Sequence, residues 1–275
     1  MMQRSHRLGV ALAGAGHSGS TLLGLVLGSH SRCFYAGEAK KSRFLGDPAK
    51  PLRKRTCKLC GEACPIWGRF RADPDLFEAL ARLSGRGAIV DSTKDVSWIR
   101  ARRAELAAAG VPHKLVFLAR DGRAVVNSRL RKDPSRDPAA VTDAWAAQVR
   151  ATSALVAELG EDALAVRYEE LATAPEAVVR RVCDHLELAF EPEMLCYETK
   201  PHHPLGGNTG TQSLIARSHG EDRGVPDRSR AFYEPLRGGF RLDLRWREEL
   251  PAPALAVFEE RAGDLNEPFR WEGEP

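Results

Sequence analysis

The sequence predicts a three-layer α/β/α fold with a central parallel sheet and a P-loop-like turn after its first strand. Short apolar runs of strand length alternate with longer stretches of helical period, which is typical of βαβ units. Several of these runs end in polar, chemistry-bearing residues, as at the carboxyl edge of an open parallel sheet. With 275 residues, 43% of them hydrophobic, the chain can bury one substantial core. We therefore expect a single domain over residues 1–275.

The first predicted strand, residues 8–13, leads into a glycine-rich turn and the start of an apolar helix. The turn nearly matches the nucleotide phosphate loop G-x-x-x-x-G-K-[ST], because Gly14, Gly19 and Thr21 are in place. Ser20, however, stands where the lysine should be. Backbone N–H groups and the positive helix end still suit one phosphate, so a nucleotide with a single 5′-phosphate is favoured over ATP or GTP hydrolysis. The alternative is a plain strand-to-helix turn that uses glycine for close packing.

The second strand is expected at residues 33–36, followed by Gly37 and Glu38. Glu38 then lies about where an open α/β sheet presents residues to a ligand, which makes it a candidate general base. The alternative is a solvated loop glutamate.

Residues 46–72 indicate an insertion, because they are rich in Pro, Gly, Lys and Arg and show no clear period. Three cysteines in a C-x-x-C-G-x-x-C pattern resemble half a zinc knuckle, but no second pair follows at zinc spacing. These are Cys57, Cys60 and Cys64. No fourth ligand is obvious, although Cys33, His30 or a water could serve. We expect a structural role, as metal clip, disulfide or packing, and the sequence does not favour bound zinc.

The next two predicted strands also end in reactive side chains. They are residues 88–91 and 113–119. Lys94 follows the first at a helix start, where the helix dipole disfavours a cation, and this misfit favours an anion-binding role. Arg120 follows the second, with Ser128 and Lys132 on the helix beyond it. The three can converge on a second phosphate, with the arginine bidentate. The alternative is a charge-rich helix start paired with nearby aspartates.

Apolar periodicity predicts the remaining regular elements. They are helices at 75–83, 96–109, 138–159, 175–186 and 254–265, and a strand at 163–167. Tyr168 follows that strand. From residue 191 the pattern becomes irregular, and we expect an irregular region around 191–275. His202 and His203 suggest metal, but adjacent side chains diverge and no third ligand has suitable spacing, so a surface loop or substrate contact is favoured.

Composition excludes several classes of protein. The net charge of +4 is mild and spread out, so nucleic acid is not expected as a partner. The sequence has no run of 18 apolar residues, so no membrane span is predicted. The N-terminus imitates a secretion signal, but cleavage there would cut the glycine-rich turn. Six unevenly spaced cysteines do not suggest a disulfide framework, and a cytoplasmic location is expected. The sequence does not indicate an oligomeric state.

Four stretches resemble, in family order, the sulfotransferases that use 3′-phosphoadenosine 5′-phosphosulfate, of a bacterial type. They are GHSGSTLLGLVL, DSTKD, LARDGRAVVNSRLRK and AVRYEEL, and they cover most of residues 8–190. The match RDGRAVVNS is the most specific, since its spacing agrees with the family's 3′-phosphate motif. The resemblance implies transfer of a sulfuryl group to an acceptor hydroxyl, with adenosine 3′,5′-bisphosphate as product. No metal is expected to be required, because the loop lacks the features that organise a chelated Mg²⁺.

The resemblance also implies roles for individual residues. The loop would hold the 5′-phosphosulfate, Arg120 and Ser128 the 3′-phosphate with help from Lys132, and Tyr168 would lie near the adenine. The implied nucleotide-binding residues are Gly16, His17, Ser18, Gly19, Ser20, Thr21, Arg120, Ser128, Lys132 and Tyr168. The implied catalytic residues are Glu38 as base, with Lys94 and His17 stabilising the leaving group. His17 stands where many family members have lysine or arginine, which shifts that stabilisation toward Lys94. His113 is an alternative base.

Two other classes of function stay open at this point. A phosphate-loop small-molecule kinase shares the fold but needs a lysine at position 20, and a non-catalytic relative would bind a nucleotide or glycan without turnover. The acceptor is expected to be a small molecule or carbohydrate, in a pocket formed by loops 40–72 and 200–240. Residues expected there are Trp67, His202, His203, Phe232 and Tyr233.

Overall fold

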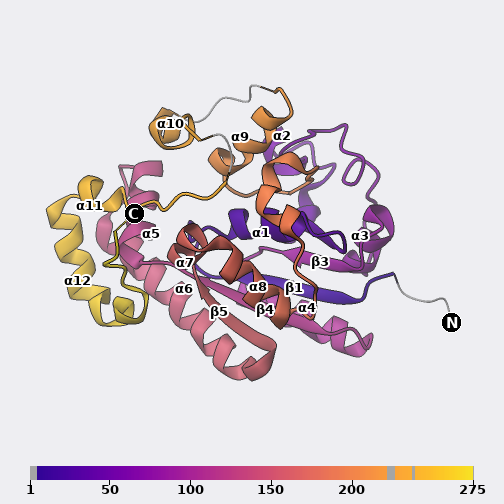
Figure 1. Ribbon diagram of the computed structural model, residues 1–275, viewed down its shortest axis with the longest axis horizontal. Helices are drawn as coiled ribbons and strands as arrows, with labels where there is room; N and C mark the ends of the chain where they lie inside the picture. Colours follow the sequence, from indigo (N-terminus) through magenta and orange to yellow (C-terminus); the bar gives the residue numbers. More distant parts are fainter. Residues whose placement is uncertain (1–4, 222–226, 237–238, 275) are drawn as a thin grey trace.

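The computed structural model describes residues 5–221, 227–236 and 239–274. Over these residues the centre is a sheet of five strands, all parallel, in the order β2-β3-β1-β4-β5 (Figure 1). The strands are β1 (Leu8–Ala13), β2 (Cys33–Gly37), β3 (Ala88–Asp91), β4 (His113–Ala119) and β5 (Ala163–Arg167). The predicted α/β/α class is confirmed, and each of these strands lies within one residue of its predicted bounds.

Helices cover both faces of the sheet, as its burial requires (Figure 1). One face carries α1 (Ser20–Gly28), α7 (Tyr168–Thr173) and α8 (Pro175–His185); the other carries α3 (Leu76–Ser84), α4 (Val96–Ala108) and α6 (Pro138–Leu159). The central strand β1 is buried along its whole length. Its Val10 and Leu12 pack in the cluster of α1 and α8, whereas Ala11 and Ala13 pack with Ile99 of α4. The two-residue period of the strand therefore divides β1 between two apolar layers.

The strand order creates a crevice above β1. The chain leaves β1 through α1 toward β2 on one side, but α4 carries it from β3 past β1 to β4 on the other. The loops that follow β1 and β4 therefore diverge from each other at the carboxyl ends of these two strands. Ligands of open α/β sheets bind at such a switch point. The glycine-rich turn and Arg120 follow these two strands directly.

The remaining elements connect or flank these layers. They are η1 (Ala39–Phe44), α2 (Leu52–Arg55), α5 (Gly122–Lys132), η2 (Gly160–Asp162), η3 (Pro192–Thr199), α9 (Thr209–Ser218), α10 (Asp227–Tyr233), α11 (Trp246–Glu249), α12 (Ala252–Asn266) and η4 (Glu267–Phe269). The sequence did not predict α9, whose Asn208 N-cap accepts a hydrogen bond from the Thr211 N–H. Within the described ranges no helix is long and apolar enough to cross a membrane.

The last long helix, α12, holds the start of α5 in place. Its Phe258 is fully buried against Trp145 of α6, with ring centroids 5.3 Å apart. Further along α12, the buried Asn266 accepts a hydrogen bond from the Gly122 N–H at 2.7 Å. Its side-chain amide also donates to Asp121, which caps α5. The C-terminal helix thus fixes the helix that follows Arg120.

Replacing Phe258 by alanine is expected to lower the free energy of unfolding by about 3–5 kcal/mol, because it removes a large buried ring and leaves a cavity. Urea denaturation followed by far-UV circular dichroism measures this loss. Leu52→Ala is the matched control, since Leu52 is 49% exposed and its truncation is expected to cost less than about 0.5 kcal/mol. Equal destabilisation by the two variants would contradict the packing described for α12.

Candidate active site

The glycine-rich turn between β1 and α1 forms a loop with unsatisfied donors. Gly14 has a φ of +135°, and a Cβ there would lie 2.5 Å from the Leu118 carbonyl oxygen. Gly19, with a φ of +92°, caps α1, and among the described residues no side chain completes this cap. The Ser18 hydroxyl is buried and likewise has no hydrogen-bond partner in the described parts of the chain. The open helix end suits a phosphate oxygen, and Ser20 and Thr21 line the cavity in front of it, whereas Ser18 is not among the lining residues.

Arg120 brings a second cationic group to the same crevice. Its buried guanidinium donates to the carbonyl oxygens of His17 and Asp243, each at 3.0 Å, and lies 3.3 Å from an Asp243 carboxylate oxygen. The group also stacks on Tyr168, 4.2 Å from the ring centroid. Its Nε is buried and has no partner among the residues described. Arg120 is also one of the residues that line the cavity, so its guanidinium places a buried positive charge there.

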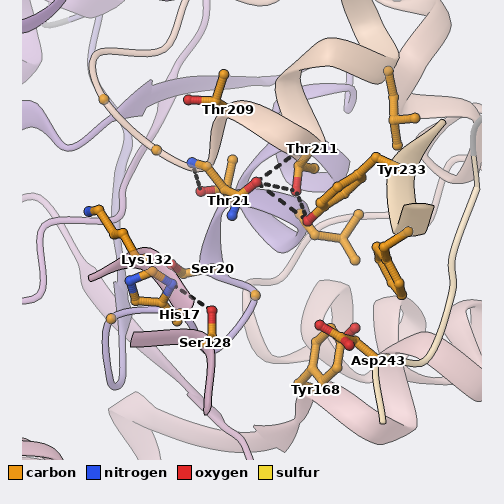
Figure 2. Close-up of a pocket in the computed structure, with 18 of the residues that line it drawn as sticks. His17, Ser20, Thr21, Ser128, Lys132, Tyr168, Thr209, Thr211, Tyr233 and Asp243 are labelled. Carbon is orange, nitrogen blue, oxygen red and sulfur yellow. Dashed lines mark hydrogen bonds between the residues drawn. The ribbon is translucent and has the colours of Figure 1, made fainter. Parts of the chain in front are cut away.

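Ser128 of α5 lies directly opposite the loop. Its Oγ is 2.9 Å from Nδ1 of His17, as Figure 2 shows. Lys132, one turn further along α5, lines the same cavity. On the adjacent side Tyr168 packs so closely that a Cβ on Gly19 would lie 2.6 Å from its ring. The two predicted anion sites therefore face one cavity.

His17 contributes a hydrogen bond to this cavity rather than a charge. Burial, together with nearby cations, lowers the pKa of His17 to about 3. These cations are Lys132, Arg129, Arg120 and Lys94. The imidazole is thus neutral at physiological pH, and the positive charge of the loop comes from the lysines and arginines around it.

The cavity has a volume of about 460 Å³, within the range of small-molecule sites. Its described lining holds ten lysine and arginine side chains and two carboxylates, those of Glu38 and Asp243. The cations are Lys41, Arg53, Lys54, Lys58, Lys94, Arg120, Arg131, Lys132, Arg241 and Arg245. This excess suits a ligand with several negative charges.

Glu38, at the end of β2, reaches this cavity as a carboxylate. One of its oxygens lies 2.7 Å from the Lys41 Nζ, and the other accepts a 3.3 Å hydrogen bond from the Gly207 N–H. Burial alone would raise the pKa of Glu38, but the charges of Lys94 and Lys41 outweigh it and hold that pKa below the usual glutamate value. The carboxylate is therefore ionised at neutral pH and able to accept a proton.

Lys94 stands beside Glu38 at the end of β3. Its Nζ donates to the Ser92 carbonyl oxygen at 2.9 Å, and burial lowers its pKa. The buried Asp91 positions both neighbours, because its carboxylate accepts from the Ala39 N–H at 2.9 Å and the Thr93 N–H at 2.8 Å. The segment after Glu38 and the segment that carries Lys94 are thus bound to one carboxylate.

One part of the site escaped prediction from the sequence: Asp243, from the segment before α11, pairs with Arg120. Residues 206–208, within the loop expected to form the acceptor pocket, cover Glu38 and the start of α1. The Asn208 N–H there donates to Thr21 Oγ1 at 2.9 Å. The glycine pair at 206–207 was a local signal for a tight turn, but nothing in the sequence showed where that turn packs.

Other predictions about the surroundings of the cavity were wrong in part. Of the residues expected around the acceptor, Phe232 and Tyr233 line the cavity, whereas Trp67, His202 and His203 are not among its lining residues. Trp67 and His202 are buried, and the Trp67 indole donates to the His203 carbonyl oxygen at 2.5 Å. His113 begins β4, at the end of the sheet opposite the cavity, so it cannot be the base.

Comparison with known proteins gives one consistent result. The model of the family described as "Sulfotransferase family" matches residues 10–192. Solved structures with the same fold include a sulfotransferase domain from the curacin biosynthetic pathway, 20% identical, with a TM-score of 0.54 over 94% of this chain and 97% of that one. The sulfotransferase domain of the Synechococcus PCC 7002 olefin synthase is 19% identical, with a TM-score of 0.55 over 95% and 97%.

Mouse sulfotransferase SULT7A1, solved in complex with PAP, is 11% identical, with a TM-score of 0.50 over 97% of this chain and 89% of its own. A search of curated proteins gave no match. At these identities the solved structures establish the fold, and the family match extends over most of the chain.

Proposed function

This chain belongs to the sulfotransferase family, and we propose that it transfers a sulfuryl group from 3′-phosphoadenosine 5′-phosphosulfate to a hydroxyl of a small-molecule or carbohydrate acceptor. The observation that carries the proposal is one cavity that both predicted anion sites line. The loop after β1 reaches it through Ser20 and Thr21, and the end of β4 and α5 reach it through Arg120 and Ser128. One nucleotide with phosphates on both sides of its ribose would contact both.

The loop after β1 is suited to the 5′-phosphosulfate. It offers the amides at the start of α1 and the hydroxyls of Ser18, Ser20 and Thr21, all at the positive end of a helix. Gly16 and Gly19 let the backbone approach the phosphate closely. With Ser20 in place of a lysine, the loop lacks the cation that would reach a γ-phosphate, and nothing in the site favours the kinase alternative.

The second phosphate is assigned to α5 and the end of β4. The Arg120 guanidinium and the Ser128 hydroxyl would bind the 3′-phosphate, with the Lys132 ammonium adding charge. The Tyr168 ring would hold the Arg120 guanidinium in place by stacking against it, and it would lie near the adenine. The PAP complex of the mouse sulfotransferase is consistent with this choice of nucleotide.

The reaction follows from the placement of Glu38 and Lys94. Glu38 would take the proton of the acceptor hydroxyl as its oxygen attacks sulfur in line with the leaving phosphate oxygen. The bond between sulfur and that oxygen breaks, which gives a sulfate ester and adenosine 3′,5′-bisphosphate. The Lys94 ammonium would stabilise the negative charge that grows on the leaving oxygen. The neutral His17 imidazole would donate a hydrogen bond to the same oxygen. Most of the rate enhancement would then come from positioning and charge stabilisation.

The pH dependence of the reaction is expected to be broad. Glu38 must be deprotonated, so kcat/KM is lost as pH falls through a pKa held below ~4.3 by Lys94 and Lys41. Lys94 must be protonated, so kcat/KM is lost again as pH rises through a pKa that burial lowers from ~10.4. Steady-state rates from pH 4 to 10 check this. An acid limb near pH ~6.5 would instead indicate a histidine base.

The experiment that tests the function is a screen with sulfur-labelled nucleotide against phenols, sugars and hydroxylated lipids. The expected result is a labelled ester from one acceptor class, with one bisphosphate formed per ester. A protein that binds the bisphosphate but labels no acceptor would instead be the non-catalytic relative.

A further inference from the structure

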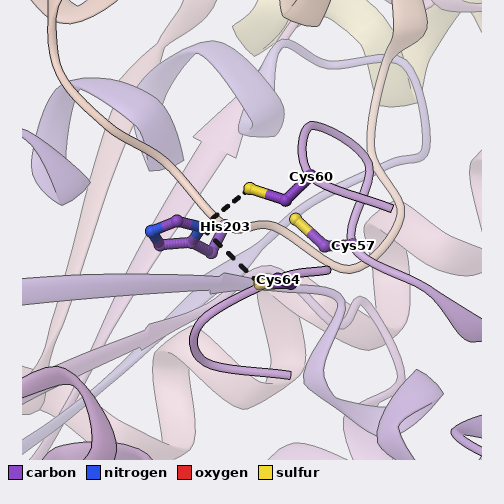
Figure 3. Close-up of side chains that lie close together, drawn as sticks. All are labelled: Cys57, Cys60, Cys64 and His203. Atoms are coloured by element: carbon purple, nitrogen blue, oxygen red, sulfur yellow. Dashed lines mark hydrogen bonds between the residues drawn. The ribbon is translucent and has the colours of Figure 1, made fainter. Parts of the chain in front are cut away.

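The insertion brings three sulfurs and one imidazole nitrogen to a single point, outside the cavity described above. The ligand atoms of Cys57, Cys60, Cys64 and His203 all lie within 4.8 Å of one another (Figure 3). Nδ1 of His203 is 3.2 Å from Cys60 Sγ and 3.6 Å from Cys64 Sγ. The fourth ligand missing from the sequence pattern is thus His203, and neither Cys33 nor His30 belongs to the group. His30 instead donates from Nε2 to the Ala189 carbonyl oxygen at 2.9 Å and accepts from the Arg32 N–H at Nδ1.

We propose that these four side chains bind a structural zinc ion. Zn–S bonds of about 2.3 Å and Zn–N bonds of about 2.0 Å place the ligand atoms of a tetrahedral site roughly 3.5–3.8 Å apart. The measured sulfur–nitrogen separations are already close to this range. Three cysteines and one histidine form a closed set of zinc ligands, which leaves no open position for substrate. The site is therefore structural and separate from sulfuryl transfer.

The backbone around the cysteines is arranged to favour thiolates. The Leu59 N–H points at Cys57 Sγ at 3.5 Å, and the Trp67 N–H points at Cys64 Sγ at 3.4 Å. Gly61 closes the first turn with a φ of +65° and a hydrogen bond to the Cys57 carbonyl oxygen at 3.1 Å. Donors aimed at sulfur stabilise its charged form, as a metal ligand requires. A disulfide would join only two of the sulfurs and leave the imidazole without a purpose.

The position of His203 gives the zinc ion a structural consequence. His203 precedes a segment that pairs in parallel with the end of β2: the Leu205 N–H donates to the Ala36 carbonyl oxygen at 2.9 Å, and the Glu38 N–H donates to the Leu205 carbonyl oxygen at 2.6 Å. Two residues later, Gly207 donates to the Glu38 carboxylate. A metal at this cluster would bind the insertion to the segment that fixes Glu38. This consequence, unlike metal binding itself, rests on the proposed function.

The test begins with the zinc content of the full chain, purified under reducing conditions and measured by inductively coupled plasma mass spectrometry. We expect about one zinc per chain in the wild type and in Cys196→Ser, whose cysteine is exposed and outside the cluster. In Cys60→Ser and His203→Ala the content is expected to fall at least about fivefold, because each lacks one of four ligands. Wild-type protein without zinc would overturn the proposal.

A second measurement does not depend on the folding of a variant. Zinc is removed from the wild type with a chelator, and Co²⁺ is added. We expect the strong visible absorption of tetrahedral cobalt, with a thiolate-to-cobalt charge-transfer band, to saturate at about one equivalent. A weak octahedral spectrum, or an intact mass that shows a Cys57–Cys64 disulfide in the purified protein, would contradict the site.

The consequence for Glu38 has its own readout. Chelation is expected to lower the melting temperature of the wild type but not that of Cys60→Ser. It is also expected to reduce kcat about tenfold with a much smaller change in the dissociation constant of adenosine 3′,5′-bisphosphate, since of the residues assigned to the nucleotide it is Thr21 that contacts the segment fixed by the metal. Zinc bound without sulfuryl transfer would defeat only the proposed function, and full activity in wild-type protein purified without zinc would defeat only this inference.

Discussion

Replacing Glu38 by glutamine is expected to lower kcat by about 10²–10⁴-fold, which is the usual contribution of a positioned general base. The amide keeps the size of the side chain and can still accept the hydrogen bond from Gly207, but it cannot take a proton from the acceptor. The ion pair with Lys41 is lost at little cost to stability, because both partners are partly exposed to solvent. Nucleotide binding is expected to stay intact.

Single-turnover transfer from labelled nucleotide measures the effect, and calorimetric titration of adenosine 3′,5′-bisphosphate reports the binding. The control is Glu158→Gln, a change to an exposed glutamate that pairs with Arg100 on the far helices α6 and α4. In the Glu38 variant, the pH profile of the residual kcat/KM is expected to lose the decrease at acid pH. Full turnover by Glu38→Gln, with bound nucleotide, would remove this residue from the base role.

Arg120→Met is expected to weaken binding of adenosine 3′,5′-bisphosphate by about 30-fold or more. Removing one partner of a buried, hydrogen-bonded charge pair costs about 2–5 kcal/mol, and each 1.4 kcal/mol is about a factor of ten in affinity. Methionine fills much of the same volume without charge. Because the guanidinium also donates to the His17 carbonyl oxygen, some of the loss is expected to reach the phosphate loop as well.

The ratio of two affinities separates these effects. Adenosine 5′-monophosphate lacks the 3′-phosphate, so its binding is expected to fall much less in Arg120→Met than that of the bisphosphate. Ser128→Ala is expected to have a smaller effect on bisphosphate binding, because it removes one hydrogen bond to the charged 3′-phosphate, worth about 1.5–3 kcal/mol. An equal loss for both nucleotides would show that Arg120 supports the loop and does not read the 3′-phosphate.

The sequence predicted those features that depend on local pattern. The strand that ends before Arg120 is a continuous apolar run, and its seven residues, His113–Ala119, have the predicted bounds in the structure. Lys94 and Glu38 were found in the same way, because side chains that follow parallel strands meet at one edge of the sheet. Their convergence on one cavity required only the strand order.

Features that depend on contacts between distant segments could not be predicted. His203 meets Cys64 across 139 residues of sequence, and Asp243 meets Arg120 across 123. No period or spacing encodes such pairs. The neutral state of His17 also required the structure, because it follows from burial among cations that come from several elements. Asn208 was a readable signal for the start of α9, but the glycines before it suggested a longer loop.

The central claim is that one cavity holds both phosphates of a single adenosine nucleotide. Isothermal titration of the wild type with adenosine 3′,5′-bisphosphate, adenosine 5′-monophosphate and ATP–Mg²⁺ tests it most directly. We predict one bisphosphate per chain, bound at least about tenfold more tightly than either other nucleotide, with a stabilisation of about 2.7 kcal/mol at a hundredfold excess over Kd. Tighter binding of ATP–Mg²⁺, or equal binding of the bisphosphate and the monophosphate, would contradict the account.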